Sequence, residues 1–137
     1  MNSETTQKLV EAARAAAAAA YAPYSRYHVG AALLTSSGEI VTGCNVENSS
    51  FGLSICAERS AVFTARGRMP IDQETAPLAG VAIHSPGPAM PWPCGACRHV
   101  LHEFAPASMP VIVDGPDGTF DTTLGELLPH AFRLETE

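Results

Sequence analysis

The sequence predicts an α/β protein in which a mixed β-sheet is covered by helices. Helical and strand patterns follow one another in the order helix, strand, strand, helix, strand, helix, strand, strand, helix. Two strand pairs are joined by short turns, Ser36–Gly38 and Asp114–Gly118, as neighbouring strands of a sheet commonly are. This order favours a sheet with helices packed against it, although it does not fix the strand order.

The first helix is expected over Glu4–Tyr21, with Ser3 as its N-cap and Pro23 as the residue that stops it. The alanine run Ala15–Ala20 has a high helix propensity and permits close packing against the sheet. Residues at helical spacing that are expected to face the sheet are Leu9, Ala13, Ala16 and Ala20.

The remaining elements follow from apolar stretches, turns and helical spacing. Strands are predicted over His28–Thr35, Glu39–Val46, Leu78–His84, Pro110–Val113 and Thr119–Thr123. Helices are predicted over Cys56–Arg66, over Cys94–Phe104, and over a short last segment capped by Thr123 that runs to Leu128. Both of the longer helices in this part begin at a cysteine that follows a loop.

Length and charge restrict the classes of function. The 137 residues fit one domain spanning 1–137. The net charge is −6 and the basic residues are scattered, which disfavours a polynucleotide partner and is compatible with a small neutral ligand. Only 16% of the residues are charged, which suggests that part of the surface is buried between subunits.

No segment resembles a secretion signal or a membrane span. The start, Met1–Lys8, is polar, and the uncharged stretch Thr75–Cys97 contains five prolines that a spanning helix would not tolerate. We therefore expect a cytoplasmic protein. In that reducing compartment its four cysteines would serve metal binding or catalysis rather than disulfides.

Three of those cysteines form the most informative pattern. Cys56 lies two residues before Glu58, and Cys94 and Cys97 are one helical turn apart, so that both can face one ion. Three thiolates at two helix starts can bind zinc and leave its fourth position for water, whose pKa the metal lowers. The sequence therefore predicts a catalytic zinc site.

Glu58 is the expected proton-transfer residue, because it lies close to a ligand yet too near in sequence to join the metal easily. Such a carboxylate can take a proton from water and deliver protons to a ring nitrogen and a leaving amine. Considered alone, it also fits an ordinary first-turn helix carboxylate that the helix dipole stabilises. Arg59 and Arg98 are placed to hydrogen-bond the sulfurs and offset their negative charge.

Two other interpretations of the cysteines stay open at this point. One is that Cys94 and Cys97 form a redox pair; this interpretation would leave Cys56 and Glu58 without a role. A closed structural zinc site would need a fourth protein ligand. The residues that could supply it are Cys44, His28, His84, His99, His102 and His130, and no spacing favours any of them.

At these residues the chain resembles the small homotetrameric cytidine deaminases. The zinc-deaminase signature has a ligand two residues before a glutamate, followed later by P-C-x-x-C. The matching segments here are C-A-E at 56–58 and P-C-G-A-C at 93–97. The resemblance continues in A-P-Y-S at 22–25, V-G-A-A-L at 29–33, G-C-N-V-E-N at 43–48 and E-L-L-P-H-A-F near the C-terminus, and so covers nearly the whole chain.

The resemblance implies a three-layer α/β/α fold with a five-stranded mixed sheet, a Zn²⁺ cofactor and a homotetramer whose active sites share residues. It implies that Asn45 and Glu47 bind the sugar and that Tyr27 packs on the base. The Ala57 amide and the Trp92 carbonyl would meet the pyrimidine edge. Phe51 and Phe132 match aromatic residues that a neighbouring subunit contributes.

The expected reaction is hydrolytic deamination of cytidine or deoxycytidine in pyrimidine salvage. Departures from the family pattern surround the expected pocket: Tyr27-His28 for Phe followed by Pro or Lys, Ser49 for Ala, Phe51 for Tyr, Trp92 for Ser or Thr, and His99 for Gln. They motivate an alternative substrate, a modified or antibiotic aminopyrimidine nucleoside. A non-catalytic zinc-stabilised binding module and a polynucleotide-editing deaminase are less favoured.

Overall fold

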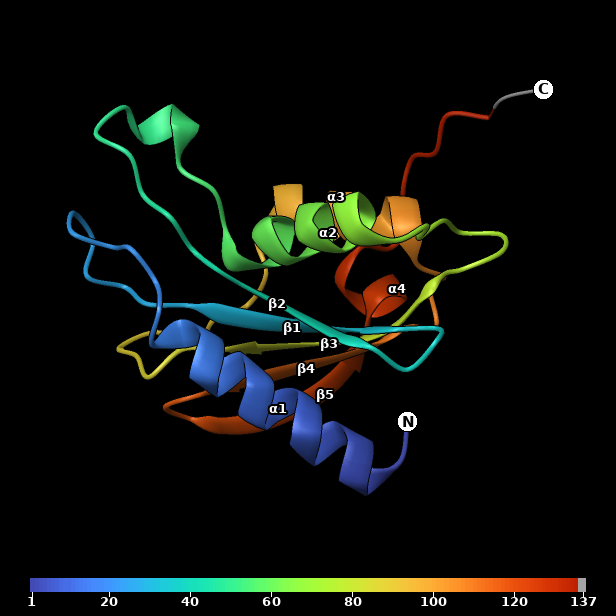
Figure 1. Ribbon diagram of the computed structural model, residues 1–137, viewed down its shortest axis with the longest axis horizontal. Helices are drawn as coiled ribbons and strands as arrows, with labels where there is room; N and C mark the ends of the chain where they lie inside the picture. Colours follow the sequence, from blue (N-terminus) through green and yellow to red (C-terminus); the bar gives the residue numbers. More distant parts are fainter. Residues whose placement is uncertain (136–137) are drawn as a thin grey trace.

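The chain forms three layers, with helices on both faces of a five-stranded mixed sheet, as the sequence predicted (Figure 1). The computed structural model describes residues 1–135. The strand order is β2-β1-β3-β4-β5, in which β3 and β4 are parallel and the other neighbours antiparallel. The strands are β1 (Gly30–Thr35), β2 (Ile40–Cys44), β3 (Leu78–His84), β4 (Pro110–Gly115) and β5 (Gly118–Thr123).

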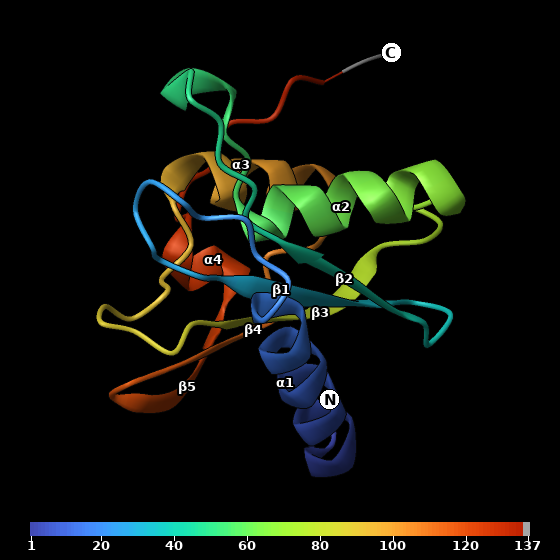
Figure 2. The ribbon, with the colours of Figure 1, turned by 60° about the vertical axis from the view of Figure 1, so that its left-hand side comes forward.

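The two faces of the sheet are covered unequally. Helix α1 (Ser3–Ala17) lies alone on one face. On the other face lie α2 (Ala57–Arg68), α3 (Gly95–Phe104) and the short α4 (Leu124–Leu127) (Figure 2). A 3₁₀ turn, η1 (Phe51–Leu53), precedes α2 and had no signal in the sequence. The larger hydrophobic core lies on the side of α2 and α3.

Helix α1 differs from the prediction at both ends. Its N-cap is Asn2, whose side chain accepts a hydrogen bond from the Thr5 amide, rather than Ser3. It ends at Ala17, before Tyr21, because Tyr21 pairs through its backbone with Asn45 and Glu47 instead. The buried positions are Leu9, Val10, Ala13 and Ala17, so Ala16 and Ala20 do not form the expected contact face.

Two glycines allow the helices to approach the sheet closely. A Cβ on Gly30 would lie 2.1 Å from the Ala13 carbonyl oxygen, and one on Gly43 would lie 2.4 Å from the Ala61 nitrogen. The alanines of α1 and α2 complete these contacts because they add only a methyl group. Gly43 therefore sets the distance of α2 from the sheet, and with it the position of the residues at the start of that helix.

The predicted strands and helices that carry the motifs are confirmed, with shifted ends. His28, Glu39 and Val46 lie outside the strands, since strand pairing begins at Gly30 opposite Cys44. Cys56 and Cys94 are N-caps of α2 and α3 rather than their first helical residues. Thr123 caps α4, as expected, by accepting a hydrogen bond from the Glu126 amide.

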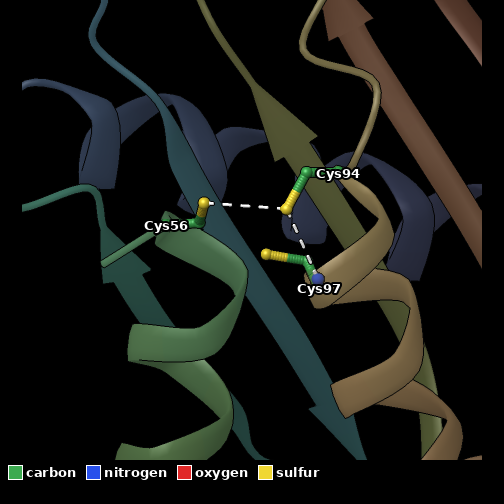
Figure 3. A group of neighbouring side chains, drawn as sticks. All are labelled: Cys56, Cys94 and Cys97. Carbon is green, nitrogen blue, oxygen red and sulfur yellow. Dashed lines mark hydrogen bonds between the residues drawn. The ribbon is translucent and has the colours of Figure 1, made fainter. Parts of the chain in front are cut away.

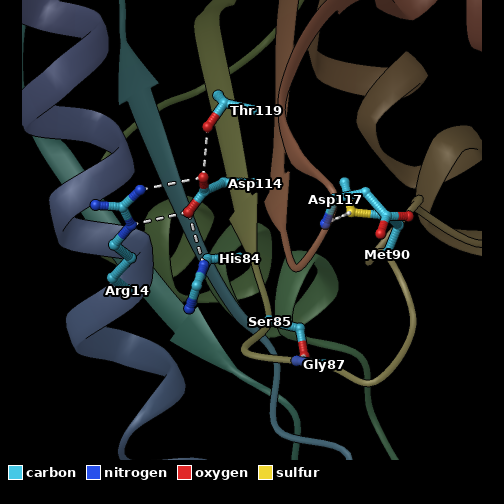
Figure 4. A network of polar contacts seen from close by, with 8 residues as sticks. All are labelled: Arg14, His84, Ser85, Gly87, Met90, Asp114, Asp117 and Thr119. Atoms are coloured by element: carbon cyan, nitrogen blue, oxygen red, sulfur yellow. Dashed lines mark hydrogen bonds and ion pairs between the residues drawn. The ribbon is translucent and has the colours of Figure 1, made fainter.

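A network of charged residues joins α1 to three strands of the sheet (Figure 4). Arg14 donates from Nε to Asp114 Oδ2 over 2.8 Å, and Nδ1 of His84 lies 2.7 Å from the same oxygen. The Thr119 hydroxyl donates to Asp114 Oδ1 over 2.6 Å. These contacts fix α1 against β3, β4 and β5. Among residues 1–135, no helix has both the length and the apolar character needed to cross a membrane.

Candidate metal centre and active-site pocket

Three cysteine sulfurs meet where α2 and α3 begin (Figure 3). Their Sγ atoms lie within 4.8 Å of one another, and Cys56 Sγ is 3.9 Å from Cys94 Sγ. The Cys97 amide lies 3.4 Å from Cys94 Sγ, so the α3 cap and the one-turn spacing bring these two residues together. The sequence prediction that the three cysteines converge is confirmed by this geometry.

The cluster fits zinc in chemistry and in size. Zinc–thiolate bonds are about 2.3 Å, so two sulfurs at a tetrahedral angle are about 3.8 Å apart. The distance of 3.9 Å between Cys56 and Cys94 agrees with that value. Within residues 1–135 the group contains three ligand atoms, all of them sulfur, and Cys44 and the histidines are not members. Three protein ligands are typical of catalytic rather than structural zinc.

The thiols of the cluster differ in acidity. A hydrogen bond from Cys97 and hydrogen bonds with Arg59 and Cys94 outweigh burial and lower the pKa of Cys56 to about 5. The pKa of Cys97 is raised, because its proton is held by the hydrogen bond to Cys56 and because its side chain is buried. The lowered pKa favours the thiolate form of Cys56, which is the form that binds a cation.

The two arginines that were expected to contact sulfur have different partners. Arg59 donates from Nη2 to Cys56 Sγ over 3.3 Å, and this hydrogen bond raises the Arg59 pKa despite partial burial. Arg98 instead donates to the Pro93 carbonyl over 2.6 Å and to the Leu127 carbonyl over 2.8 Å. Arg98 therefore binds two backbone carbonyls instead of the expected sulfur. It reaches the Leu127 carbonyl because α4 packs beside α3.

Glu58 lies in the first turn of α2 and is 4% exposed. Burial raises its pKa to about 7, and the negative charge of Cys56 adds to that effect. Hydrogen bonds with its own amide and with Cys97 oppose the rise without cancelling it. A carboxyl group with this pKa beside a sulfur cluster can both accept and donate a proton near neutral pH.

A pocket of about 680 Å³ opens beside the cysteines and Glu58. This volume is typical of a small-molecule site. Its lining includes all of the predicted substrate residues except Phe132, together with part of the loop between β3 and α3. The lining residues that the sequence had singled out are Tyr27, Asn45, Glu47, Phe51, Ala57 and Trp92, beside Cys56, Glu58, Arg59 and Cys94.

Asn45 and Glu47 reach the pocket wall, where both already hold protein groups. Asn45 accepts from the Val29 amide over 2.9 Å and donates to the Tyr27 carbonyl over 2.7 Å. Glu47 accepts from the Tyr24 and Ser25 amides and from the Ser25 hydroxyl. These bonds, that of the Ser25 hydroxyl above all, lower the Glu47 pKa, so the side chain remains an anion that can accept a further hydroxyl proton.

Comparisons with known proteins identify the family. Residues 3–113 match the family described as "Cytidine and deoxycytidylate deaminase zinc-binding region". The chain belongs to this family. A cytidine deaminase of Halalkalibacterium halodurans is 44% identical over 133 residues, which cover 94% of this chain and 95% of that protein. The cytidine deaminase of Burkholderia pseudomallei has a crystal structure that matches with a TM-score of 0.85 at 41% identity, covering 96% of this chain and 100% of that one.

A more distant family relative has a different substrate in its name. The blasticidin-S deaminase of Bacillus cereus is 30% identical over 112 residues, which cover 77% of this chain and 76% of that protein. The description of the matching family names only the zinc-binding region, and the names of these relatives give different substrates. Differences between substrates are then expected on the pocket walls.

Phe51 and Phe132, the aromatic residues expected from a neighbouring subunit, lie in different places in this family member. Phe51 is 73% exposed, stands at the mouth of the chain's own pocket, and meets Tyr24 edge to face with ring centroids 5.6 Å apart. Phe132 is 69% exposed and stacks on His99, at 6.3 Å and an angle of 10°. Both rings leave much apolar surface uncovered in the single chain.

Several residues that shape the pocket of this chain were not predicted from the sequence. Ser25 holds Glu47, and the loop residues Met90 and Pro91 form part of the wall. Ser25 lies in the A-P-Y-S segment, but its partner is 22 residues away and no local pattern predicts that contact. The loop residues carry neither charge nor periodic spacing, so no signal in the sequence would have found them.

Proposed function

We propose that this protein is a zinc-dependent hydrolase that deaminates free cytidine and deoxycytidine to the uridine products and ammonia. The observation that carries the proposal is the convergence of three cysteine sulfurs with one buried carboxyl group, Glu58, in a pocket large enough for a nucleoside. The family relatives named cytidine deaminases support the choice of substrate.

Cys56, Cys94 and Cys97 are the proposed zinc ligands, and zinc bound there supplies an activated water as nucleophile near neutral pH. Arg59 holds the Cys56 sulfur in place and offsets its negative charge through the hydrogen bond of 3.3 Å. Arg98 holds the start of α3 by joining Pro93 to α4. Each arginine therefore maintains the position of one part of the ligand set.

Glu58 is the proposed catalytic acid and base. Its carboxylate takes a proton from the attacking water and passes it to N3 of the pyrimidine ring as the nucleophile adds at C4. The same side chain then takes the proton of the hydroxyl added at C4 and delivers it to the exocyclic amine, which leaves as ammonia as the C4 carbonyl forms. The pKa of about 7 suits these opposite steps, because neither protonation state is strongly disfavoured.

The remaining pocket residues are proposed to orient the nucleoside. The Ala57 amide and the Trp92 carbonyl would hydrogen-bond the edge of the base, and the Tyr27 ring would pack on its face. Asn45 and Glu47 would bind the sugar hydroxyl groups. The negative charge kept on Glu47 and its position on the pocket wall support the sugar role.

Activity on defined substrates tests this proposal directly. Purified protein loaded with one zinc per chain is mixed with cytidine, deoxycytidine, cytosine and adenosine, and both the absorbance loss and the ammonia released are recorded. We expect turnover of the two cytosine nucleosides and little of the free base or the purine. Absence of turnover of both cytosine nucleosides by zinc-replete protein would exclude the proposed substrates.

A second candidate substrate is a cytosine-containing antibiotic or another modified nucleoside. The similarity to the blasticidin-S deaminase and the exposed aromatic groups at the pocket mouth favour it. The same assay extended to such nucleosides ranks the substrates by kcat/KM, which is the quantity that measures discrimination. An antibiotic nucleoside with a higher kcat/KM than cytidine would reassign the function without changing the chemistry.

We also propose that the protein is a homotetramer that acts in cytoplasmic pyrimidine salvage. Phe51, Leu53, Phe132 and Leu134 are 69 to 75% exposed, which is a large apolar surface to leave in water. Light scattering should show four chains per particle, and full activity of a monomer would contradict the shared active sites.

A further inference from the structure

The loop that connects β3 to α3, residues 85–93, forms one wall of the pocket. It begins at Ser85, which is fully buried and whose amide donates to the Asp114 carbonyl over 3.1 Å. The Ser85 hydroxyl accepts from the Gly87 amide over 3.2 Å. We call residues 85–93 the rim loop. It contributes Pro88, Ala89, Met90, Pro91 and Trp92 to the pocket lining.

The rim loop rests on the turn between β4 and β5 (Figure 4). The Asp117 amide lies 3.4 Å from the sulfur of Met90. A Cβ on Gly115 would lie 2.7 Å from that sulfur and 2.9 Å from Cδ of Pro91, so the loop fits against a position without a side chain. Two residues that line the pocket, Met90 and Pro91, are therefore also supported by the end of β4 and the turn that follows it.

On the pocket side the loop is held by Tyr27. The Tyr27 hydroxyl donates to the Ala89 carbonyl over 2.9 Å and so joins two walls that are 62 residues apart in the sequence. Burial raises the pKa of this phenol, so it keeps its proton and remains a donor near neutral pH. The same ring lines the pocket, so the hydrogen bond crosses from one wall to the other at its edge.

The Tyr27 backbone is itself fixed, which gives the hydroxyl a defined direction. Its amide donates to the Ser25 hydroxyl over 3.0 Å, and its carbonyl accepts from Asn45 over 2.7 Å. The preceding residue, Arg26, has a φ of 59°, a conformation that non-glycine residues adopt at a cost. Hydrogen bonds therefore hold the Tyr27 amide and carbonyl at one end and its hydroxyl at the other.

We propose that the hydrogen bond from the Tyr27 hydroxyl to the Ala89 carbonyl is a latch that holds the rim loop against the pocket and thereby limits the size of the base that is accepted. This inference rests on the proposed function, in which the Trp92 carbonyl of the same loop meets the base edge. Tyr27 acts through the loop, so the hydroxyl is a positioning and specificity group, separate from the ring.

The variant Tyr27→Phe removes the latch and keeps the ring. Loss of one hydrogen bond is expected to raise the KM for cytidine about three- to tenfold while kcat changes less than about twofold. Relative to cytidine, kcat/KM for 5-methylcytidine and 5-iodocytidine should rise by a similar factor, because the Ala89 segment of the loop is no longer held by Tyr27. The control Tyr21→Phe removes an exposed phenol that makes no side-chain hydrogen bond within residues 1–135, and it should change none of these values.

Hydrogen exchange of the zinc-loaded protein tests the latch without any substrate. In Tyr27→Phe the amides of Gly87, Ala89, Met90 and Trp92 should exchange about three- to tenfold faster than in the parent and in Tyr21→Phe. Unchanged exchange in the rim loop, or unchanged selectivity between cytidine and its 5-substituted forms, would overturn the proposal. If the parent protein deaminates no cytosine nucleoside, the proposed function fails, and the exchange measurement still decides whether the latch exists.

Discussion

Two buried carboxyl groups, one on each side of the sheet, show how differently the two faces are built. Glu58 and Asp114 are each 4% exposed. Burial raises the pKa of both groups, but at Asp114 the hydrogen bonds from Arg14, Thr119 and His84 outweigh it and lower the pKa to about 2. At Glu58 burial dominates and the pKa is raised to about 7.

The difference follows from the number and charge of the partners. Asp114 has a guanidinium, an imidazole and a hydroxyl around it, so its anion is fully satisfied and α1 is fixed to the sheet. Glu58 lies beside the negatively charged Cys56, which opposes its ionisation. A carboxylate whose negative charge is balanced by hydrogen-bond donors stabilises a fold. A carboxyl group without enough such donors has a raised pKa and is available for proton transfer. The predictions below test that division between a structural and a reactive face.

The largest expected effect is on catalysis. Replacing Glu58 by glutamine should lower kcat about 10²- to 10⁴-fold, because the proton relay is lost, while the zinc content stays at one per chain. Steady-state kinetics and metal analysis of the purified variant measure both quantities. The matched change on the other face, Asp114→Asn, should leave kcat within about threefold. A comparable loss of kcat in both variants would contradict the division between a reactive Glu58 and a structural Asp114.

The next effect concerns the two close helix contacts. Gly43→Ala and Gly30→Ala each force a methyl group into helix backbone, at 2.4 Å and 2.1 Å, and each should lower the free energy of unfolding by about 1–3 kcal/mol or more. Only Gly43→Ala should also weaken zinc retention, since α2 carries Cys56 at its cap. Thermal melts and chelator competition of the folded variants provide the readout. Equal zinc loss in both would show that α2 is not the coupling element.

A smaller effect is expected from the charged network itself. Asp114→Asn should cost about 1–3 kcal/mol of unfolding free energy at pH 7, because the charge-assisted bonds to Arg14 and His84 are weakened. Urea denaturation of the zinc-loaded protein measures it. Asp121→Asn, an exposed acidic residue on β5, is the control and should stay close to the parent. A stability loss no larger than that of the control would mean that the network contributes little.

The smallest effect is on how the free energy of unfolding depends on pH, for which Asp114 and Glu58 contribute with opposite signs. The Asp114 pKa is lowered, so its stabilising contribution is complete above about pH 4, near the unfolded value, and is lost as the pH falls toward about 2. The Glu58 pKa is raised, so its contribution is complete below about pH 4 and is lost as the pH rises through about 7. The difference in unfolding free energy between the parent and Asp114→Asn should therefore shrink below pH 4. A difference that is constant down to pH 2 would contradict the lowered pKa.

Much of the reactive centre could be predicted because it is local. A cysteine at a helix cap and a glutamate two residues later have nearly fixed relative positions once α2 forms, and the same holds for the two cysteines of the C-x-x-C turn once α3 forms. Only the packing of α2 beside α3 brings Cys56 to 3.9 Å from Cys94, which is 38 residues away. The two arginines mark the limit of that reasoning. Both follow motif residues, yet Arg59 binds sulfur and Arg98 binds the carbonyls of Pro93 and Leu127, because α4 lies beside α3.

The sequence by itself determined the α/β class and the order of the elements, since both depend on periodicity and on turn residues. It also determined that Glu58 follows Cys56 by two residues and that Cys94 and Cys97 are one helical turn apart, because these spacings lie within one turn of a helix. Tertiary structure alone decided the strand order, the end of α1 at Ala17 rather than Tyr21, the opposite pKa shifts of Glu58 and Asp114, and the hydrogen bond from Tyr27 to Ala89. Those features arise from contacts between segments that are distant along the chain. Burial and partner geometry, which set their energies, exist only after the sheet and its two helical layers have come together.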